Sequence, residues 1–446
     1  MKPKRFKRSW LAGFVVGVLL LTAACATADP TDAPADTGGE PADTGGDADE
    51  VVELTFWNIV ISDTFTSWWE NYVDEWNAAN PNVQVTYETF ETEAYKSRIA
   101  AAVIAGTAPD LFYQIPGPET AAWFDEGKLL PLEGVLDTDR FLPGAQEGCS
   151  DSGQMVCVPM YLAPSFIYYN TEQFADAGID RDSWADPMQP TLDEFLAAGE
   201  ALKAAGHIPI ALGNADNWPG LFYFWAAQNR YGGIDELFNA VDGAGAYTDP
   251  SFINAGEFVQ MLETNDYFPD GFNGIGGDQT FTIFTQGNGA MIFQGPWVNG
   301  IITAEAPEGF EYDFFHFPSF PDGVSNSQTD LMSGFDALWI NAELPHTQEV
   351  ADFLSGFYDP DTALDFMLAT ENISSIVGVA EAAAAEGSNP QLSALTEASG
   401  FAANFYPWWD WTLQPAVTEQ MMSSGQALFI SELTPMEFSE AMEAQR

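Results

Sequence analysis

The sequence predicts an α/β protein with two lobes. Segments with strand-like alternation and segments with helical spacing of aromatic residues follow one another along the chain. This order favours mainly parallel strands joined by helices that cover both faces of a sheet. About 400 of the 446 residues follow the polar N-terminal region, which is more than one hydrophobic core usually supports. We therefore expect the chain to divide into two lobes.

The first elements of this pattern lie directly after residue 50. Residues 52–57 alternate between apolar and polar side chains and predict a strand, and residues 64–79 repeat aromatics at helical spacing. A second strand is expected over 83–90 and a second helix over 95–105. The segment 105–113 then leads into a third strand, so the first lobe begins as a strand–helix–strand–helix–strand unit.

Residues 1–24 are expected to be an export signal that is not part of the fold. Five basic residues precede an apolar segment, Leu11 to Leu21, which is too short to span a bilayer comfortably. The stretch from Leu21 to Cys25 resembles a bacterial lipobox, so Cys25 is the predicted lipidation site. Thr22 departs from the large aliphatic residue that is usual there. The alternative is an ordinary signal peptide cleaved near the same site, and either reading predicts an exported chain.

Residues 25–50 are predicted to be a disordered acidic linker. From residue 26 onward they contain no aromatic and no large aliphatic side chain, and they repeat Pro-Ala-Asp-Thr-Gly-Gly. Such a segment cannot bury enough apolar surface to fold. We predict that it is a flexible tether that holds a lipid-anchored domain away from the membrane. No later segment has the apolar length of a membrane span, so we expect membrane contact through the N-terminal lipid only.

The mature chain is strongly acidic. Without the five basic residues of the signal, 8 Lys and Arg stand against 66 Asp and Glu, a net charge of −58. Such a charge disfavours binding to nucleic acid and to anionic lipid. A cation-binding surface is one interpretation. We prefer a solvated coat that keeps the protein soluble in high salt, where the repulsion is screened.

Cysteines and histidines give little support for a metal site. With Cys25 lipidated, Cys149 and Cys157 remain as a pair around Gly153, where a hairpin with a three-residue turn would place them opposite each other. In an exported protein this pair predicts a disulfide. The three histidines are scattered along the chain, so we expect neither a metal nor another cofactor.

The stretch from 285 to 300 holds the strongest functional signal. Residues 290–293 form a short apolar run between glycines, which predicts a buried strand, and Gly295-Pro296 then breaks it. Trp297 follows at the turn, and open α/β folds bind ligands at the carboxyl ends of their strands. An indole offers an apolar face and one N–H donor, which suits a sugar ring. The alternative is that Trp297 only caps the core.

Several motifs resemble those of the family 1 extracellular solute-binding proteins, the maltose-binding-protein-like carbohydrate receptors of ABC importers. Gly287, Ala290, Met291, Gly295 and Trp297 match the family's signature positions. The stretches 105–113, 158–170, 190–212 and 333–340 also resemble family segments, in the family's order. The resemblance implies a type II periplasmic-binding-protein-like fold, with a ligand cleft between two lobes.

The resemblance and the strand ends together give a set of candidate ligand-binding residues. Pro190 to Phe195 contains a capping box, and the polar loop that follows the strand 208–212 ends at Asn217 and Trp218. The resemblance places Tyr161 near the cleft and a ligand-stacking aromatic near the C-terminus, within Trp408-Trp409-Asp410-Trp411. The predicted ligand-binding residues are Trp57, Tyr113, Tyr161, Asn217, Trp218, Trp297, Asp336, Trp408 and Trp409.

We therefore expect a non-catalytic sugar receptor. Lobe 1 is assigned to 51–162 plus about 328–358, and lobe 2 to 163–327 plus about 359–446. The protein would act as a monomer that binds a mono- or oligosaccharide and delivers it to an ABC permease. The same fold could instead bind a polyamine or a peptide. A secreted glycoside hydrolase is the third interpretation, because it too combines aromatics with paired carboxylates.

Overall fold

The computed structural model describes residues 51–386 and 390–446. The predicted signal 1–24, the lipidation site Cys25 and the linker 25–50 lie outside the described residues. None of the described helices has both the length and the apolar character needed to cross a membrane.

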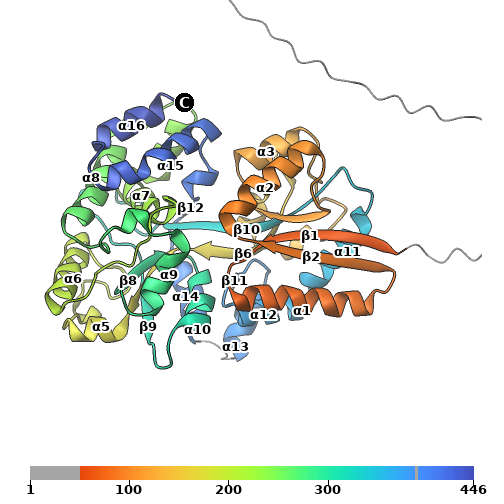
Figure 1. Ribbon diagram of the computed structural model, residues 1–446, viewed down its shortest axis with the longest axis horizontal. Coiled ribbons are helices and arrows are strands. Elements are labelled where there is room, and N and C mark those ends of the chain that lie inside the picture. Colours follow the sequence, from red (N-terminus) through yellow and green to blue (C-terminus); the bar gives the residue numbers. More distant parts are fainter. Residues whose placement is uncertain (1–50, 387–389) are drawn as a thin grey trace, which may run out of the picture. The chain divides into compact units, whose positions relative to one another are not determined.

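The larger sheet defines the first lobe (Figure 1). Its strands follow the spatial order β11-β6-β10-β3-β1-β2, and β12 pairs with the start of β10. They are β1 (Val52–Ile59), β2 (Val83–Phe90), β3 (Leu111–Gln114), β6 (Val158–Pro164), β10 (Leu331–Ile340), β11 (Ile373–Ser374) and β12 (Phe405–Tyr406). β1, β2 and β3 are parallel as predicted, whereas β10 is antiparallel to both β3 and β6.

The helices of the first lobe cover this sheet. They are α1 (Asp63–Ala79), α2 (Thr92–Ala105), α3 (Pro118–Asp125), the short η1 (Thr138–Arg140), α4 (Pro143–Gly148), α11 (Thr347–Phe357) and α12 (Pro360–Thr370). The helix predicted over 64–79 is confirmed as α1, which begins where Ser62 Oγ accepts a hydrogen bond from the Phe65 amide at 3.1 Å. Its aromatic face packs into the core through Trp69, which is fully buried.

The second lobe is built on a smaller sheet. β8 (Met291–Gln294), β7 (Phe166–Asn170) and β9 (Tyr312–Phe315) lie in that order, and both pairings are antiparallel. The prediction of a mainly parallel sheet is therefore wrong for this lobe. The apolar run 208–212 was expected to be a strand and contributes only an isolated parallel bridge from Ile210 to Met291.

Helices surround the smaller sheet. They are α5 (Thr171–Asp176), η2 (Arg181–Ser183), α6 (Leu192–Ala205), α7 (Trp218–Val241), α8 (Pro250–Thr264), η3 (Phe272–Gly274), α9 (Gly277–Thr285), α10 (Trp297–Glu305), η4 (Trp409–Trp411), α15 (Pro415–Phe429) and α16 (Pro435–Glu443). α13 (Val379–Glu386) and α14 (Pro390–Ser399) precede β12. The predicted capping box is confirmed at the start of α6, where Thr191 and Glu194 bond reciprocally.

The chain changes lobe where β6 continues into β7, where β9 leads back to β10, and again between β11 of the first lobe and α15 of the second (Figure 1). At the first two crossings the Ser165 amide donates to the Met332 carbonyl at 2.8 Å. After β10 the chain stays with the first lobe, because Phe366 of α12 packs on Trp68 of α1 and β11 pairs with β6. We therefore place residues 360–374 in the first lobe, which differs from the sequence-based boundary near 358.

A buried arginine fixes the connection between β9 and β10. Arg230 of α7 is 1% exposed, and its guanidinium donates to backbone carbonyls of this connection. The acceptors are Phe317 at 3.2 Å, Pro318 at 3.1 Å, Ser327 at 2.8 Å and Asp330 at 3.0 Å. Because the guanidinium bonds to four carbonyls of this connection away from water, the crossing segment is held to the second lobe.

Cys149 and Cys157 form the predicted disulfide. They flank a hairpin of β4 (Ser150–Asp151) and β5 (Gln154–Met155). The turn has two residues, Ser152 and Gly153, both with positive φ, and not the three that we expected. Two positive φ values suit the twist of a tight hairpin.

Candidate ligand-binding site

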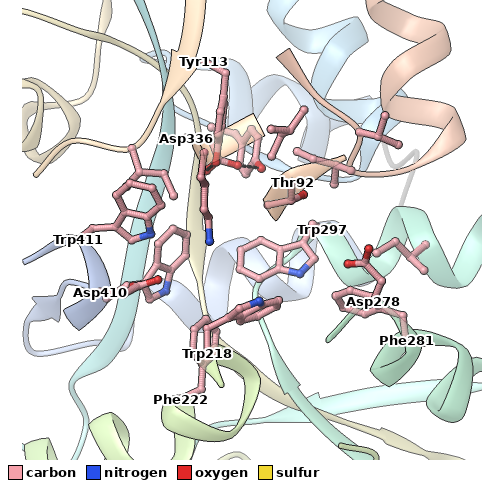
Figure 2. A pocket seen from close by; sticks show the side chains of 18 residues that line it. Thr92, Tyr113, Trp218, Phe222, Asp278, Phe281, Trp297, Asp336, Asp410 and Trp411 are labelled. Atoms are coloured by element: carbon pink, nitrogen blue, oxygen red, sulfur yellow. Dashed lines mark hydrogen bonds between the residues drawn. The ribbon is translucent and has the colours of Figure 1, made fainter. Parts of the chain in front are cut away.

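A cleft that opens to solvent lies between the two lobes. Figure 2 shows the side chains that line it, which come from strand ends, helix starts and the η4 segment. Ligand-binding clefts are commonly lined by apolar side chains with a few polar groups.

Aromatic side chains of the second lobe form one wall of the cleft. The wall consists of Trp218, Phe222, Trp297 and Trp408, which we call the aromatic wall. Trp297 meets Trp408 edge-on with ring centroids 5.6 Å apart, and Phe222 lies parallel to Trp408 at 6.2 Å. Trp297 and Trp218 are only partly buried, so their rings keep surface for a ligand. The indole nitrogen of Trp408 is buried without a partner among the described residues and offers one N–H donor.

Two glycines allow these indoles to lie where they do. A Cβ on Gly334 of β10 would come within 2.6 Å of the Trp408 ring, and a Cβ on Gly295 would collide with the Trp297 ring. Each indole therefore rests directly on a backbone that has no side chain, which explains why glycine precedes Trp297 by two residues.

Asp336 lies at the floor of the cleft and is held by two tyrosines (Figure 2). Tyr113 donates to its Oδ1 at 2.8 Å and Tyr161 donates to its Oδ2. A register shift between β10 and β6 occurs directly after Asp336, and such a bulge redirects side chains. Burial raises the pKa of Asp336 to about 6, although the two tyrosine hydroxyls favour the carboxylate. Its oxygens are thus engaged within the protein.

Asp410 has a carboxylate oxygen that the protein does not use. Its Oδ1 is buried and finds no hydrogen-bond partner within residues 51–386 and 390–446. Burial raises the pKa of Asp410 to about 6, and the nearby Lys96 partly opposes this rise. Lys96 belongs to α2 of the first lobe and lies 5.6 Å from the ring centroid of Trp411. Asp410 and Trp411 therefore form a polar end of the cleft that can accept a donor from a ligand.

Acidic side chains from both lobes meet near Asp278, at the other side of the cleft in Figure 2. The pKa of Asp278 is raised by burial and by the negative charges of Glu91, Asp216 and Glu93. Glu91 and Glu93 lie at the start of α2, whereas Asp278 lies in the first turn of α9. The lobes thus face each other with like charge at this point.

The opposite wall comes from the first lobe and is aliphatic. Ile59, Val60 and Ile61 at the end of β1 and Ile115 after β3 line the cleft, and we call them the aliphatic wall. Val60 is 43% exposed, which is unusual for a side chain next to a buried strand end. The wall carries no polar side-chain atom of its own.

Six of the nine residues predicted for ligand binding line the cleft. They are Tyr113, Tyr161, Trp218, Trp297, Asp336 and Trp408. Asp336 was expected to accept sugar hydroxyls, and the structure instead pairs it with the two tyrosines.

The other three predicted residues do not line the cleft. Trp57 packs against Phe90 with centroids 5.4 Å apart and under the guanidinium of Arg98, on the face of the sheet that α2 covers. Alternation along β1 sends it away from the cleft. Asn217 has φ 64 and its Oδ1 accepts from the Gln426 amide at 2.9 Å, so its amide joins α7 to α15.

Trp409 is a core residue. It is fully buried and packs against Trp225 and Phe252, with centroids 6.4 Å and 5.5 Å away. Trp408 lines the cleft, whereas Trp409 packs against aromatic side chains from the helices of the second lobe.

Sequence reasoning missed several residues of the cleft. Those outside the aliphatic wall are Thr92, Lys96, Phe222, Asp278, Phe281, Ile301, Asp410 and Trp411. Asp410 carried a signal, since it lies among three tryptophans. Lys96 and Asp278 carried none, because only the tertiary arrangement brings these charged side chains of surface helices to the cleft. In the described part of the chain, no three His, Cys, Asp or Glu side chains gather in a way that could hold a metal ion.

Comparison with known proteins identifies the family. Residues 62–372 match the bacterial extracellular solute-binding protein family. The chain belongs to this family. An uncharacterized ABC transporter extracellular-binding protein of Pyrococcus horikoshii is 27% identical over 215 residues, which cover 47% of each chain. The chain thus spans about half the length of this curated relative. Family membership places this solute-binding protein outside the cytoplasm.

Solved structures share the fold of this solute-binding protein. A chitin oligosaccharide binding protein is similar with a TM-score of 0.79 and 25% identity, over 89% of this chain and 98% of that one. A protein from a study of xylan utilization by Caldanaerobius polysaccharolyticus gives a TM-score of 0.80 and 25% identity, over 88% and 99%. The predicted two-lobed type II binding-protein fold is therefore confirmed.

Proposed function

We propose that this protein is a receptor that binds a mono- or oligosaccharide between its lobes and delivers it to an ABC permease. The aromatic wall carries the proposal, because a sugar ring presents C–H faces that stack on indoles. Trp297 and Trp218 are partly exposed and provide such faces, whereas Trp408, 5% exposed, supports Trp297 edge-on. Asp410 Oδ1 and the Trp408 N–H supply an unused acceptor and an unused donor for hydroxyl groups.

Membership of the solute-binding family and similarity to a chitin oligosaccharide binding protein support a sugar ligand and a transporter partner. We propose that ligand contacts from both lobes stabilise a closed form, which the permease recognises. We further propose that Cys25 carries the lipid anchor and that the receptor acts as a monomer without catalytic activity.

Titration calorimetry against a panel of neutral mono- and oligosaccharides tests the proposal. The protein is prepared without residues 1–24 and titrated at low and at high salt. We expect saturable binding of one sugar class, and about 100-fold weaker binding by Trp297→Ala, the loss typical of a central aromatic contact. Trp57→Ala is the matched control, since this indole lies outside the cleft.

A cationic ligand is the second candidate, because Asp278, Glu91 and Glu93 concentrate negative charge beside the cleft. Spermidine and a short basic peptide therefore belong in the same titrations. Binding of spermidine that high salt abolishes, together with no response to any sugar, would overturn the sugar assignment. Chromatography of the oligosaccharides after incubation would reveal shortened products if the protein were a glycoside hydrolase.

A further inference from the structure

We propose that the sugar recognised by this receptor carries apolar substituents, such as acetyl groups or the methyl group of a deoxy sugar, which pack on the aliphatic wall. This inference rests on the proposed function and names the class of sugar. The two walls differ in chemistry, and only the aromatic wall has the features that an unsubstituted sugar needs.

The aliphatic wall consists of four apolar side chains. Ile59, Val60, Ile61 and Ile115 are consecutive or neighbouring in space at the ends of β1 and β3. Val60 has the largest exposure among them, at 43%. Its amide donates to the Phe90 carbonyl at 2.9 Å, so the backbone holds Val60 in place. An apolar group on the ligand would remove this side chain from water, which is favourable.

Side-chain oxygens near the aliphatic wall already accept hydrogen bonds within the protein. Asn58 Oδ1 accepts from the Ile59 amide at 2.8 Å, and Gln114 Oε1 accepts from the Ile115 amide at 3.0 Å. The Asp336 carboxylate accepts from Tyr113 and Tyr161. These hydrogen bonds occupy acceptor oxygens of Asn58, Gln114 and Asp336. The polar side chains that the first lobe still presents to the cleft are Thr92 and Lys96, at the start of α2.

An unsubstituted sugar would lose hydrogen bonds to water at the aliphatic wall. Its hydroxyls point outward around the ring, and those turned toward the aliphatic wall would give up water without gaining partners. The methyl group of an acetyl substituent or of a deoxy sugar has no hydrogen bond to lose there, and it covers the wall. The polar end of the cleft remains available to other hydroxyls, because Asp410 Oδ1 has no partner among the described residues.

Matched pairs of sugars test the inference. N-acetylated chitotriose is compared with cellotriose, which has the same linkage and a hydroxyl in place of each acetamido group. Acetylated xylotriose is compared with xylotriose, and L-fucose with L-galactose. The three pairs distinguish N-acetyl, O-acetyl and deoxy methyl groups. We expect one substituted member to bind at least about tenfold more tightly than its partner, a difference that a few buried methyl or methylene groups can produce.

A protein variant links this preference to the wall. Val60→Thr keeps the shape and replaces one methyl group by a hydroxyl, and we expect it to reduce the preference about threefold or more. Val377→Thr is the matched control, because Val377 is 55% exposed and lies outside the cleft. Calorimetry measures both variants with the same sugar pairs.

Each outcome decides something. Equal or tighter binding of the unsubstituted members would overturn the inference while leaving the sugar receptor intact. A preference that Val60→Thr does not change would also overturn it, since the wall would then not be its origin. Absence of saturable binding by every sugar would overturn the proposed function, and this inference with it.

Discussion

The two walls of the cleft are built from different kinds of side chain, held in place in different ways. The aromatic wall uses large side chains that lie on bare backbone, as Trp408 does on Gly334. The aliphatic wall uses ordinary strand ends, where Ile59 to Ile61 continue beyond β1. The first wall offers flat faces and N–H donors, whereas the second offers only apolar contact.

This difference implies that the walls contribute unequally to binding. A flat indole can discriminate the face of a sugar ring, because stacking and its single N–H donor both depend on orientation. Aliphatic side chains exclude water and reject unpaired hydroxyls without fixing orientation. We therefore expect the second lobe to provide most of the affinity and the first lobe to select among sugars. Four predictions concern residues of the two walls and their surroundings, from the largest expected effect to the smallest.

The largest effects are expected at the sequence neighbours Trp408 and Trp409, where the same substitution should change affinity in one case and stability in the other. Trp409→Ala removes a fully buried ring and should lower the free energy of unfolding by about 3–5 kcal/mol, as large core truncations do. Trp408→Ala should lower sugar affinity by about 100-fold, equivalent to about 2.7 kcal/mol. Urea unfolding and calorimetry measure the two quantities. Loss of affinity in folded Trp409→Ala, without loss of stability, would contradict the assignment of Trp409 to the core.

The next effect concerns Asp336 at the floor between the walls. Its folded-state pKa of about 6 lies above the usual value of 3.8, so the folded state binds the proton more tightly. This contribution to stability is present below pH 4 and is lost as pH rises through 6. The loss is about 3 kcal/mol by order of magnitude, and Asp336→Asn should abolish it.

Urea unfolding between pH 4 and pH 7 checks this prediction as the difference between the wild type and Asp336→Asn. Tyr113→Phe is an informative comparison, because it removes one hydroxyl that favours the carboxylate. The pH range of the stability loss should then extend upward. A pH-independent difference between wild type and Asp336→Asn would show that Asp336 does not titrate in this way.

A smaller effect should appear at the polar end of the cleft. If Asp410 accepts a ligand hydroxyl as a carboxylate, affinity should fall several-fold when acidification through about pH 6 protonates it. Lys96→Met removes the charge that opposes protonation, so the loss of affinity should begin at higher pH. Calorimetry between pH 5 and pH 8 measures the profiles. Asp410→Asn serves as the control and should lack the step, and an unchanged step would exclude Asp410 as its origin.

The smallest effect is expected outside both walls. Trp57→Phe should change affinity less than twofold, because Trp57 contacts Phe90 and Arg98 on the face of the sheet away from the cleft. The same change at Trp297 should weaken binding about tenfold, since a smaller ring without the N–H replaces the indole. Calorimetry with the preferred sugar compares the two variants, and equal losses would contradict the placement of Trp57.

The sequence allowed the three tryptophans of the aromatic wall to be predicted, but it left Phe222 and the aliphatic wall unnoticed. Trp218 and Trp297 follow apolar runs, so the rule that ligands bind at strand ends applied to them directly. Ile59 to Ile61 looked like ordinary strand residues, because exposure at a strand end cannot be read from residue type. Asp336 was recognised as a candidate, but its tyrosine partners lie 223 and 175 residues away in the sequence. Such pairing follows from the fold and not from local pattern.

Arg230 restricts how the two lobes can move. Its guanidinium ties four carbonyls between Phe317 and Asp330 to α7, so this stretch moves with the second lobe as one rigid piece. At this crossing a change of angle between the two sheets is then left to the few peptides around Ser165 and Met332, which bond to each other. The crossing acts as a short flexure with few degrees of freedom.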